Sequence, residues 1–179
     1  MQRTLSISLT LSLLLCSAQV LAQSVLMPQS KLGFTFKQMN VPVNGQFKNF
    51  QAKIAFDPKK LASTVAELTI PLNSVDTGTA DANAMLQNMD WFGVNKFPTA
   101  RFVARKVTAT AAGKFLIVGD LSIKGKTQTV QSIASFKPSA PNSLAGVFEG
   151  SLTIPRLSFD IGIGEWKDES MVANSVGIQ

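Results

Sequence analysis

The chain has 179 residues, a formal net charge of +6 and no histidine, and its single cysteine is Cys16 near the N-terminus. Beyond Cys16 the chain therefore has no thiolate nucleophile, disulfide or cysteine-bound metal, and it lacks the Ser-His-Asp triad and histidine-ligated haem or iron throughout. Carboxylates, lysines and hydroxyls remain for catalysis. This composition disfavours an enzyme, and we predict no catalytic residues, no metal site and no cofactor.

The first residues have the pattern of an export signal. Arg3 is the only charge before Lys31, the stretch Leu5–Leu15 is rich in Ser and Leu, and Val20-Leu21-Ala22 supplies small residues at the −3 and −1 positions. The apolar run is too short to span a bilayer, which needs about 20 residues. We expect a signal peptide over residues 1–22 with cleavage after Ala22, a periplasmic location, and one domain over residues 23–179.

Neither a lipid anchor nor nucleic-acid binding is favoured. A lipoprotein signal needs a small residue before Cys16, where Leu15 stands. The basic residues are spread along the chain, and their densest cluster, Arg101, Arg105 and Lys106, has no interleaved aromatic residues. The simpler interpretation is that these charged side chains lie on solvent-exposed faces of strands.

The dominant hydrophobic period is two, which is typical of strands with one buried and one solvated face. It occurs in eight segments, residues 31–37, 50–56, 65–72, 101–105, 115–123, 130–136, 148–154 and 172–178. Between the first two, Asn44-Gly45 is a tight turn or a bend within a long strand. Ala111-Ala112-Gly113 and Lys124-Gly125-Lys126 indicate hairpins. Eight strands at this spacing predict an all-β antiparallel barrel or sandwich.

One segment has a helical period instead. The apolar residues Ala82, Met85, Leu86 and Met89 have the spacing i, i+3, i+4, i+7, which predicts a helix over residues 79–89. Thr77 or Thr79 could cap it, and Asp81 lies favourably in its first turn. An apolar stripe of this width needs a partner, and in a barrel the natural place is an open end.

Several motifs, in order, resemble those of the YceI-like family. They are Ser74-Val75-Asp76-Thr77, Leu86, Asp90-Trp91-Phe92, Lys96-Phe97-Pro98-Thr99-Ala100-Arg101-Phe102, and Val118-Gly119-Asp120-Leu121-Ser122-Ile123-Lys124-Gly125. Val43-Asn44-Gly45-Gln46-Phe47, Leu157-Ser158-Phe159-Asp160-Ile161-Gly162 and Gly164-Glu165-Trp166-Lys167-Asp168 agree as well. The resemblance extends over the chain from about residue 24 to its end.

The resemblance implies an eight-stranded, lipocalin-like antiparallel barrel with the helix near an open end. It also implies an exported protein that holds a long isoprenoid or another amphiphile, such as a quinone or fatty acid, inside the barrel. The chain departs from the family where an Arg, an Asp and a His are often found, because these positions are Ala82, Asn83 and Met85 here. Head-group contacts of the family are therefore not transferred.

The candidate ligand contacts are the apolar side chains on the inward faces and at the helical end. They are Phe34, Phe36, Phe56, Leu68, Ile70, Met85, Leu86, Met89, Trp91, Phe92, Phe102, Ile117 and Leu121. The competing interpretation is that these side chains fill a solid core, since a small eight-stranded barrel either packs solid or holds one ligand. Arg101 and Arg156 are candidates for an anionic head group, because guanidinium binds phosphate at two points. A surface ion pair is their alternative role.

We predict a carrier of a long-chain amphiphile, and three rivals are weighed against it. The most serious alternative is a packed β-barrel that acts through its surface as an interaction module and binds no ligand. Separately from these functions, a homodimer is left open. An integral outer-membrane barrel is disfavoured, because the second face carries Lys31, Lys37, Lys53, Glu67 and Arg101. A carboxylate-dependent hydrolase would need an acidic pair inside the barrel, and the apolar faces contain none.

Overall fold

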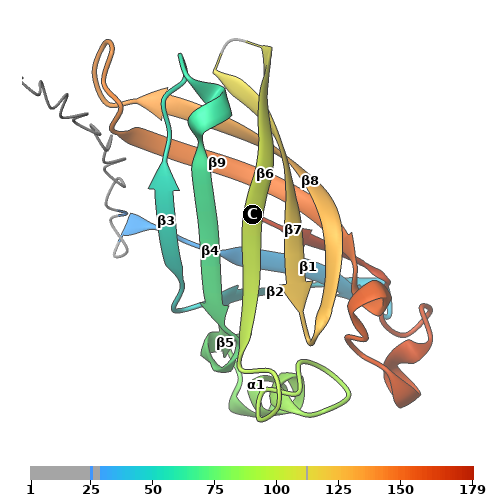
Figure 1. The fold of residues 1–179 in the computed structure, drawn as a ribbon. Helices are drawn as coiled ribbons and strands as arrows, with labels where there is room; N and C mark the ends of the chain where they lie inside the picture. The colour runs from blue at the N-terminus through green and yellow to red at the C-terminus, as the bar shows by residue number, and fades with distance from the viewer. Residues whose placement is uncertain (1–24, 26–28, 112) are drawn as a thin grey trace, which may run out of the picture.

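The computed structural model describes residues 25, 29–111 and 113–179, which form one curved β-sheet with a helix at one end (Figure 1). The strands in this part of the chain are β1 (Gly33–Gln38), β2 (Val41–Phe47), β3 (Gln51–Ala55), β4 (Val65–Pro71), β5 (Val75–Asp76), β6 (Thr99–Ala111), β7 (Lys114–Ile123), β8 (Lys126–Pro138), β9 (Gly146–Pro155) and β10 (Ser175–Ile178). The helix is α1 (Ala80–Gln87), and the short 3-10 turns are η2 (Leu61–Ser63), η3 (Leu72–Ser74), η4 (Arg156–Phe159) and η5 (Gly164–Lys167). The predicted signal peptide, residues 1–22, lies outside the described residues.

The strands form a single antiparallel sheet that curls into a half-barrel. Their order is β3-β4-β6-β7-β8-β9-β10-β1-β2-β5. The long central strands β6, β7 and β8 are joined by tight connections. β10 lies between β9 and β1 and pairs with both. Because β3 and β5 are the two edge strands, a seam remains between the ends of the sheet. The predicted all-β, antiparallel, lipocalin-like architecture is confirmed.

The strand count is ten and not the predicted eight, because β2 and β5 were not counted as separate strands. Of the two alternatives for Asn44-Gly45, a tight turn or a position within a strand, the structure shows the second. Asn44 and Gly45 lie inside β2, opposite Thr35 and Phe34 of β1. The turn lies earlier, at Met39 and Asn40, whose φ angles of 49° and 64° are those that a two-residue type I′ hairpin requires. Gly45 serves packing and not a turn, because a Cβ there would overlap the ring of Phe34.

The helix is confirmed, with slightly different ends. Thr79 is its N-cap, and its hydroxyl accepts a hydrogen bond from the Ala82 N–H at 3.4 Å. Leu86 is buried, as the apolar stripe predicted. Met89 is half exposed because α1 ends at Gln87, so Met89 lies beyond the last turn and outside the stripe. Figure 1 shows α1 at one end of the half-barrel, below the ends of β4 and β6.

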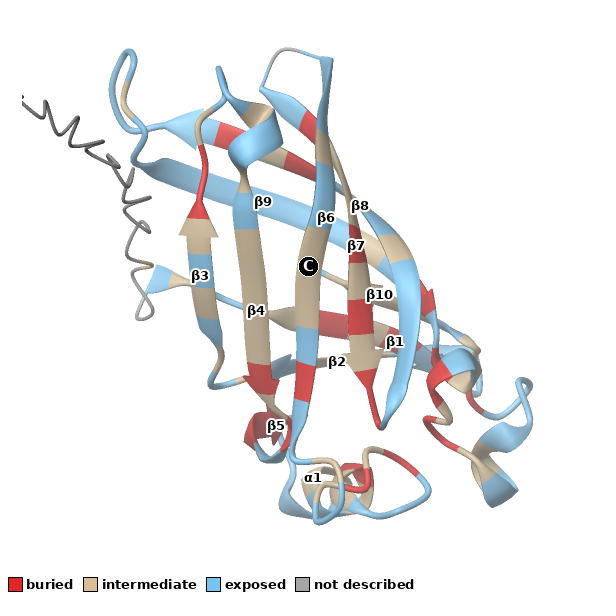
Figure 2. Cartoon of the chain, in the orientation of Figure 1, coloured by how far each residue is buried: buried red, intermediate tan, exposed pale blue. Residues whose placement is uncertain are grey.

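The interior is divided into a large and a small hydrophobic cluster. The large cluster gathers at the end that α1 covers, and the small one at the opposite end (Figure 2). In the small cluster Phe56 packs edge-on against Phe115, Phe136 and Phe148, with ring centroids 5.1, 5.2 and 4.9 Å away. These four rings pack together at that end of the half-barrel, and Phe148 is the one among them that is partly exposed.

No helix among the described residues has the length and apolar character needed to cross a membrane.

Candidate ligand cavity

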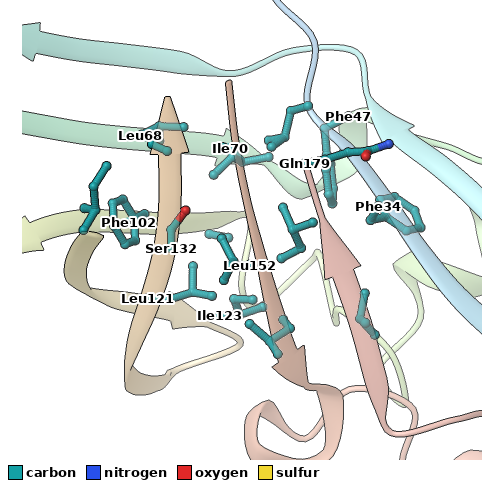
Figure 3. A pocket seen from close by; sticks show the side chains of 18 of the residues that line it. Phe34, Phe47, Leu68, Ile70, Phe102, Leu121, Ile123, Ser132, Leu152 and Gln179 are labelled. Atoms are coloured by element: carbon teal, nitrogen blue, oxygen red, sulfur yellow. The ribbon is translucent and has the colours of Figure 1, made fainter. Parts of the chain in front are cut away.

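A cavity of about 350 Å³ lies inside the half-barrel, between the two hydrophobic clusters. Its walls are the inward-facing side chains of the strands, because successive residues of a strand point to opposite faces. Figure 3 shows Leu68, Phe102 and Leu121 on one side of the cavity and Phe34 and Phe47 on the other. The side chains are almost all apolar, and the volume lies within the range typical of small-molecule sites.

The predicted ligand contacts converge on this cavity, with two exceptions. The predicted residues that line it are Phe34, Phe36, Phe56, Leu68, Ile70, Leu86, Trp91, Phe92, Phe102, Ile117 and Leu121. Met85 packs against the large hydrophobic cluster without lining the cavity, and Met89 is half exposed. The sequence analysis missed Leu72, Ile123 and Ile161, which also line it. Leu72 and Ile123 continue predicted inward faces, whereas Ile161 lies in an irregular segment with no periodicity to reveal it.

The end near α1 is closed by two irregular segments bound to each other. The carbonyl oxygen of Asp90 accepts hydrogen bonds from the N–H groups of Gly162 and Ile163 at 2.8 and 3.0 Å. The Trp91 ring packs beside the rings of Phe36 and Trp166, with centroids 6.4 and 5.6 Å away. The segment after α1 and the segment after β9 therefore form one floor beneath the cavity.

Arg156 holds this floor together through all of its N–H groups. Its Nε donates to the carbonyl of Ala173 at 3.1 Å. One terminal nitrogen donates to the carbonyls of Ile161 and Gly162 at 2.8 and 2.6 Å, and the other to those of Trp166 and Val172, both at 2.7 Å. Only 1% of the residue is exposed. A guanidinium has five N–H donors, so Arg156 lines the cavity with no donor left for a ligand head group.

Burial lowers the pKa of the Arg156 guanidinium from its ordinary value, and the charge of Glu169 opposes this. A second buried cation lies in the turn between β7 and β8. The Lys124 ammonium donates to the carbonyl of Asp160 at 2.6 Å, and burial lowers its pKa against the attraction of Asp160 and Asp90. Both cations therefore bind backbone oxygens of the same floor, and their geometry indicates a structural role.

Arg101, the other predicted head-group residue, points away from the cavity. Its neighbours Ala100 and Phe102 line the cavity, so alternation places Arg101 on the outer face of β6. There its Nε and one terminal nitrogen donate to the Glu67 carboxylate at 2.9 and 2.7 Å. The structure shows the surface ion pair that the sequence analysis gave as the alternative.

The cavity opens to solvent at one side. The lining residues that are also exposed are Lys31, Phe148, Glu149, Gly150 and Gln179. Lys31 and Gln179 adjoin the start of β1 and the end of β10, where the N–H of Gly33 donates to the carbonyl of Gln179 at 2.8 Å. The mouth therefore lies between these strand ends and the first half of β9.

Two polar side-chain atoms of the cavity wall are buried without a protein partner among the described residues. They are the Oγ1 of Thr64 and the Nε1 of Trp91. Thr64 lies just before β4, near the small hydrophobic cluster of phenylalanine rings (the phenylalanine cluster), whereas Trp91 lies in the floor at the other end. The other hydroxyl among the described lining residues, that of Ser132, donates to the carbonyl of Ser151 at 3.0 Å.

An antiparallel half-barrel around an apolar cavity, with a helix at one end, defines an all-β protein of lipocalin-like architecture. A family model described as the YceI-like domain matches residues 25–179. The chain belongs to the YceI-like family, as its motifs predicted. Among described residues no group of three or more His, Cys, Asp or Glu side chains is arranged to hold a metal ion.

Solved structures and curated proteins agree with this assignment. The crystal structure of BcnA from Burkholderia cenocepacia superposes with a TM-score of 0.82 at 38% identity, over 87% of this chain and 96% of that one. A polyisoprenoid-binding domain from Saccharophagus degradans has a TM-score of 0.61, over 83% of this chain and 88% of its own. At 16% identity this second similarity concerns the fold alone.

The similar curated proteins are longer than the region of similarity. A UPF0312 protein of Shewanella denitrificans is 37% identical over 101 residues, which are 56% of this chain and 50% of that protein. A UPF0312 protein of Ectopseudomonas mendocina is 32% identical over 120 residues, 65% of this chain and 63% of that protein. The chain thus spans between half and two thirds of the length of these relatives.

Proposed function

We propose that the protein is a carrier that holds one long-chain amphiphile, such as an isoprenoid, quinone or fatty acid, and performs no chemistry on it. The observation that carries this proposal is the apolar cavity of about 350 Å³, which opens to solvent between the start of β1, the end of β10 and the first half of β9. A solid core would leave no such space, because protein interiors normally contain few voids larger than a water molecule.

Burial of the ligand's apolar surface supplies the binding energy. Each buried CH2 group contributes about 0.8 kcal/mol, so about fifteen such groups contribute about 12 kcal/mol. Lost freedom and ordering cost roughly 4–15 kcal/mol on association. Micromolar or tighter affinity is therefore feasible without any charged contact. This agrees with the cavity wall, where Arg156 has no free donor and which does not include Arg101.

The similar structures support the ligand class. The Saccharophagus degradans domain, which has the same fold, is described as polyisoprenoid-binding. We further propose that the protein acts in the periplasm after removal of residues 1–22, which have the charge and hydrophobic pattern of an export signal. Fractionation of cells that express the full chain tests the location, since a cytosolic, uncleaved product would contradict it.

Native mass spectrometry tests the carrier function. The protein is purified without detergent, measured intact, then extracted with organic solvent and measured again. We expect an adduct that extraction removes, and we expect the extracted protein to take up farnesol, a fifteen-carbon isoprenoid alcohol. An unliganded mass together with no uptake of farnesol, a quinone or a fatty acid would overturn the proposal and favour the packed interaction module.

A further inference from the structure

The floor of the cavity contains one side-chain N–H donor that the protein leaves unused. Trp91 is 4% exposed and lines the cavity, and its Nε1 has no acceptor among the described residues. A buried indole N–H normally has a hydrogen-bond partner. Its ring is held between Phe36, Trp166 and the backbone at Gly162, so it cannot turn away to reach solvent without disturbing the floor.

Arg156, the floor cation that lines the cavity, cannot complete the same role. All five N–H groups of Arg156 donate to backbone carbonyls. The Lys31 ammonium is a lining cation, but it belongs to the exposed mouth. A charged phosphate at the floor would therefore be buried without a free cation, which is strongly unfavourable. An uncharged oxygen needs only one donor.

We propose that the indole N–H of Trp91 is the polar recognition group of the cavity and binds an uncharged oxygen of the amphiphile, such as a hydroxyl, carbonyl or ether. This inference rests on the proposed carrier function and deepens it by specifying ligand chemistry and orientation. The oxygen lies at the closed end beneath the barrel, and the hydrocarbon chain extends past Phe102 towards the phenylalanine cluster. An uncharged amphiphile is preferred over its phosphorylated form.

The experiment compares farnesol with farnesene, a hydrocarbon of the same carbon number, on solvent-extracted protein. The chain has two tryptophans, so the indole N–H signals of Trp91 and Trp166 are resolved by ¹H–¹⁵N NMR of labelled protein. We expect farnesol to move the Trp91 signal to lower field, as a new hydrogen bond does. We expect farnesene to bind without that shift. Equal shifts from both compounds would overturn the proposal.

Three variants and one further ligand give an independent readout. We expect Trp91→Phe to lower the affinity ratio of farnesol to farnesene by about three- to tenfold, the range for one hydrogen bond. Trp166→Phe is the matched control, and Thr64→Val removes the unpaired hydroxyl at the opposite end. A loss of the ratio in Thr64→Val instead, or tighter binding of farnesyl diphosphate than of farnesol, overturns the assignment.

The outcomes separate this inference from the proposed function. If neither farnesol nor farnesene binds, the carrier function itself fails. If both bind and neither the Trp91 signal nor the affinity ratio responds as expected, the carrier function stands and the role of Trp91 is wrong. If Trp91→Phe does not fold, the NMR comparison on the unaltered protein decides alone.

Discussion

Arg156 acts as a structural cation whose five donors join the segment after β9 into one floor. Replacement by lysine keeps the charge but loses the planar fork, so most of the five carbonyls lose their partner. We expect Arg156→Lys to lower the free energy of unfolding by about 3–5 kcal/mol, the range for breaking a buried charged network. Urea unfolding followed by circular dichroism measures this.

Arg101→Met provides the matched control for that experiment. Arg101 also donates twice, but to Glu67 on the exposed outer face of β6. Exposed ion pairs contribute about 0.2–1 kcal/mol, so the loss here should be within that range. Comparable losses in Arg156→Lys and Arg101→Met would contradict the structural role of Arg156.

Asp76 gives the protein an acid-sensitive contact near α1. Its carboxylate lies 3.0 Å from the Lys48 ammonium and accepts from the Gly78 N–H at 3.1 Å and from Asn83 at 3.4 Å. Lys48 contributes most to this environment, which lowers the pKa of Asp76 from 3.8 to about 2. The stabilisation is therefore complete above about pH 4 and is lost as the pH falls towards 2.

We expect the melting temperature of the unaltered protein to fall more steeply between pH 4 and pH 2 than that of Asp76→Asn. The amide cannot titrate, so the variant lacks this contribution at every pH. Thermal scans at half-unit pH intervals measure the difference between the two curves. Curves that stay parallel over this interval would show that Asp76 contributes nothing to acid sensitivity.

At the scale of single residues, the sequence predicted which side chains meet inside but not what each polar one does. Phe102 was recognisable because it and Ala104 alternate with Arg101 and Arg105 along one strand. The role of Arg156 was not recognisable, because its five acceptors are backbone carbonyls of an irregular segment and every residue type carries such a carbonyl. Only the folded chain reveals that they converge.

At the scale of elements, glycines within strands make room for aromatic rings. A Cβ at Gly119 of β7 would lie 2.5 Å from the Phe102 ring and 2.6 Å from the carbonyl oxygen of Val103. Because the carbonyl cannot yield, we expect Gly119→Ala to destabilise the protein by about 1–3 kcal/mol, as overpacking does. Gly150→Ala on β9 is the control, since its nearest contact would be an ordinary 3.5 Å.

Denaturant unfolding compares the two alanine variants, and farnesol titration shows whether the displaced Phe102 ring also obstructs the cavity. A loss for Gly150→Ala as large as that for Gly119→Ala would mean that alanine is unfavourable in these strands for reasons other than the ring contact.

The elements themselves were predictable where periodicity was long. The strands that became β4, β7 and β8 alternate over many residues, and Thr79 begins a clear helical stripe. β2 was not counted as a separate strand because Asn44-Gly45 is a strong turn signal that left a turn and a strand position both open, whereas the actual turn at Met39 and Asn40 contains no glycine. The packing of Phe34 over Gly45 overrode the local preference, and such a long-range contact is invisible in the sequence.

At the scale of the whole molecule, periodicity predicted an apolar interior but not whether it was empty. At one end the rings of Phe56, Phe115, Phe136 and Phe148 pack against one another. The space beside them exists because the sheet curls into a half-barrel with β3 and β5 as unjoined edges. Curvature and seam depend on the pairing of all ten strands, which no local pattern specifies.

The two faces of β6 allow a decisive comparison of hydrophobic and charged contributions to ligand binding. Phe102 lines the cavity, whereas its neighbour Arg101 lies outside in an ion pair with Glu67. Phe102→Asp places a carboxylate in an apolar wall, where a charge is strongly disfavoured. We expect it to weaken farnesol uptake by at least about tenfold, and Arg101→Ala to leave uptake within about twofold.

Phe102→Ala accompanies this pair, because the aspartate variant could fail to fold and the alanine variant removes only apolar contact. Titration of solvent-extracted protein with farnesol, with circular dichroism of each variant, separates lost binding from lost structure. If folded Arg101→Ala lost more affinity than folded Phe102→Ala, a charged group on the outer face would dominate recognition. The interior of the half-barrel would then not be the place where the amphiphile binds.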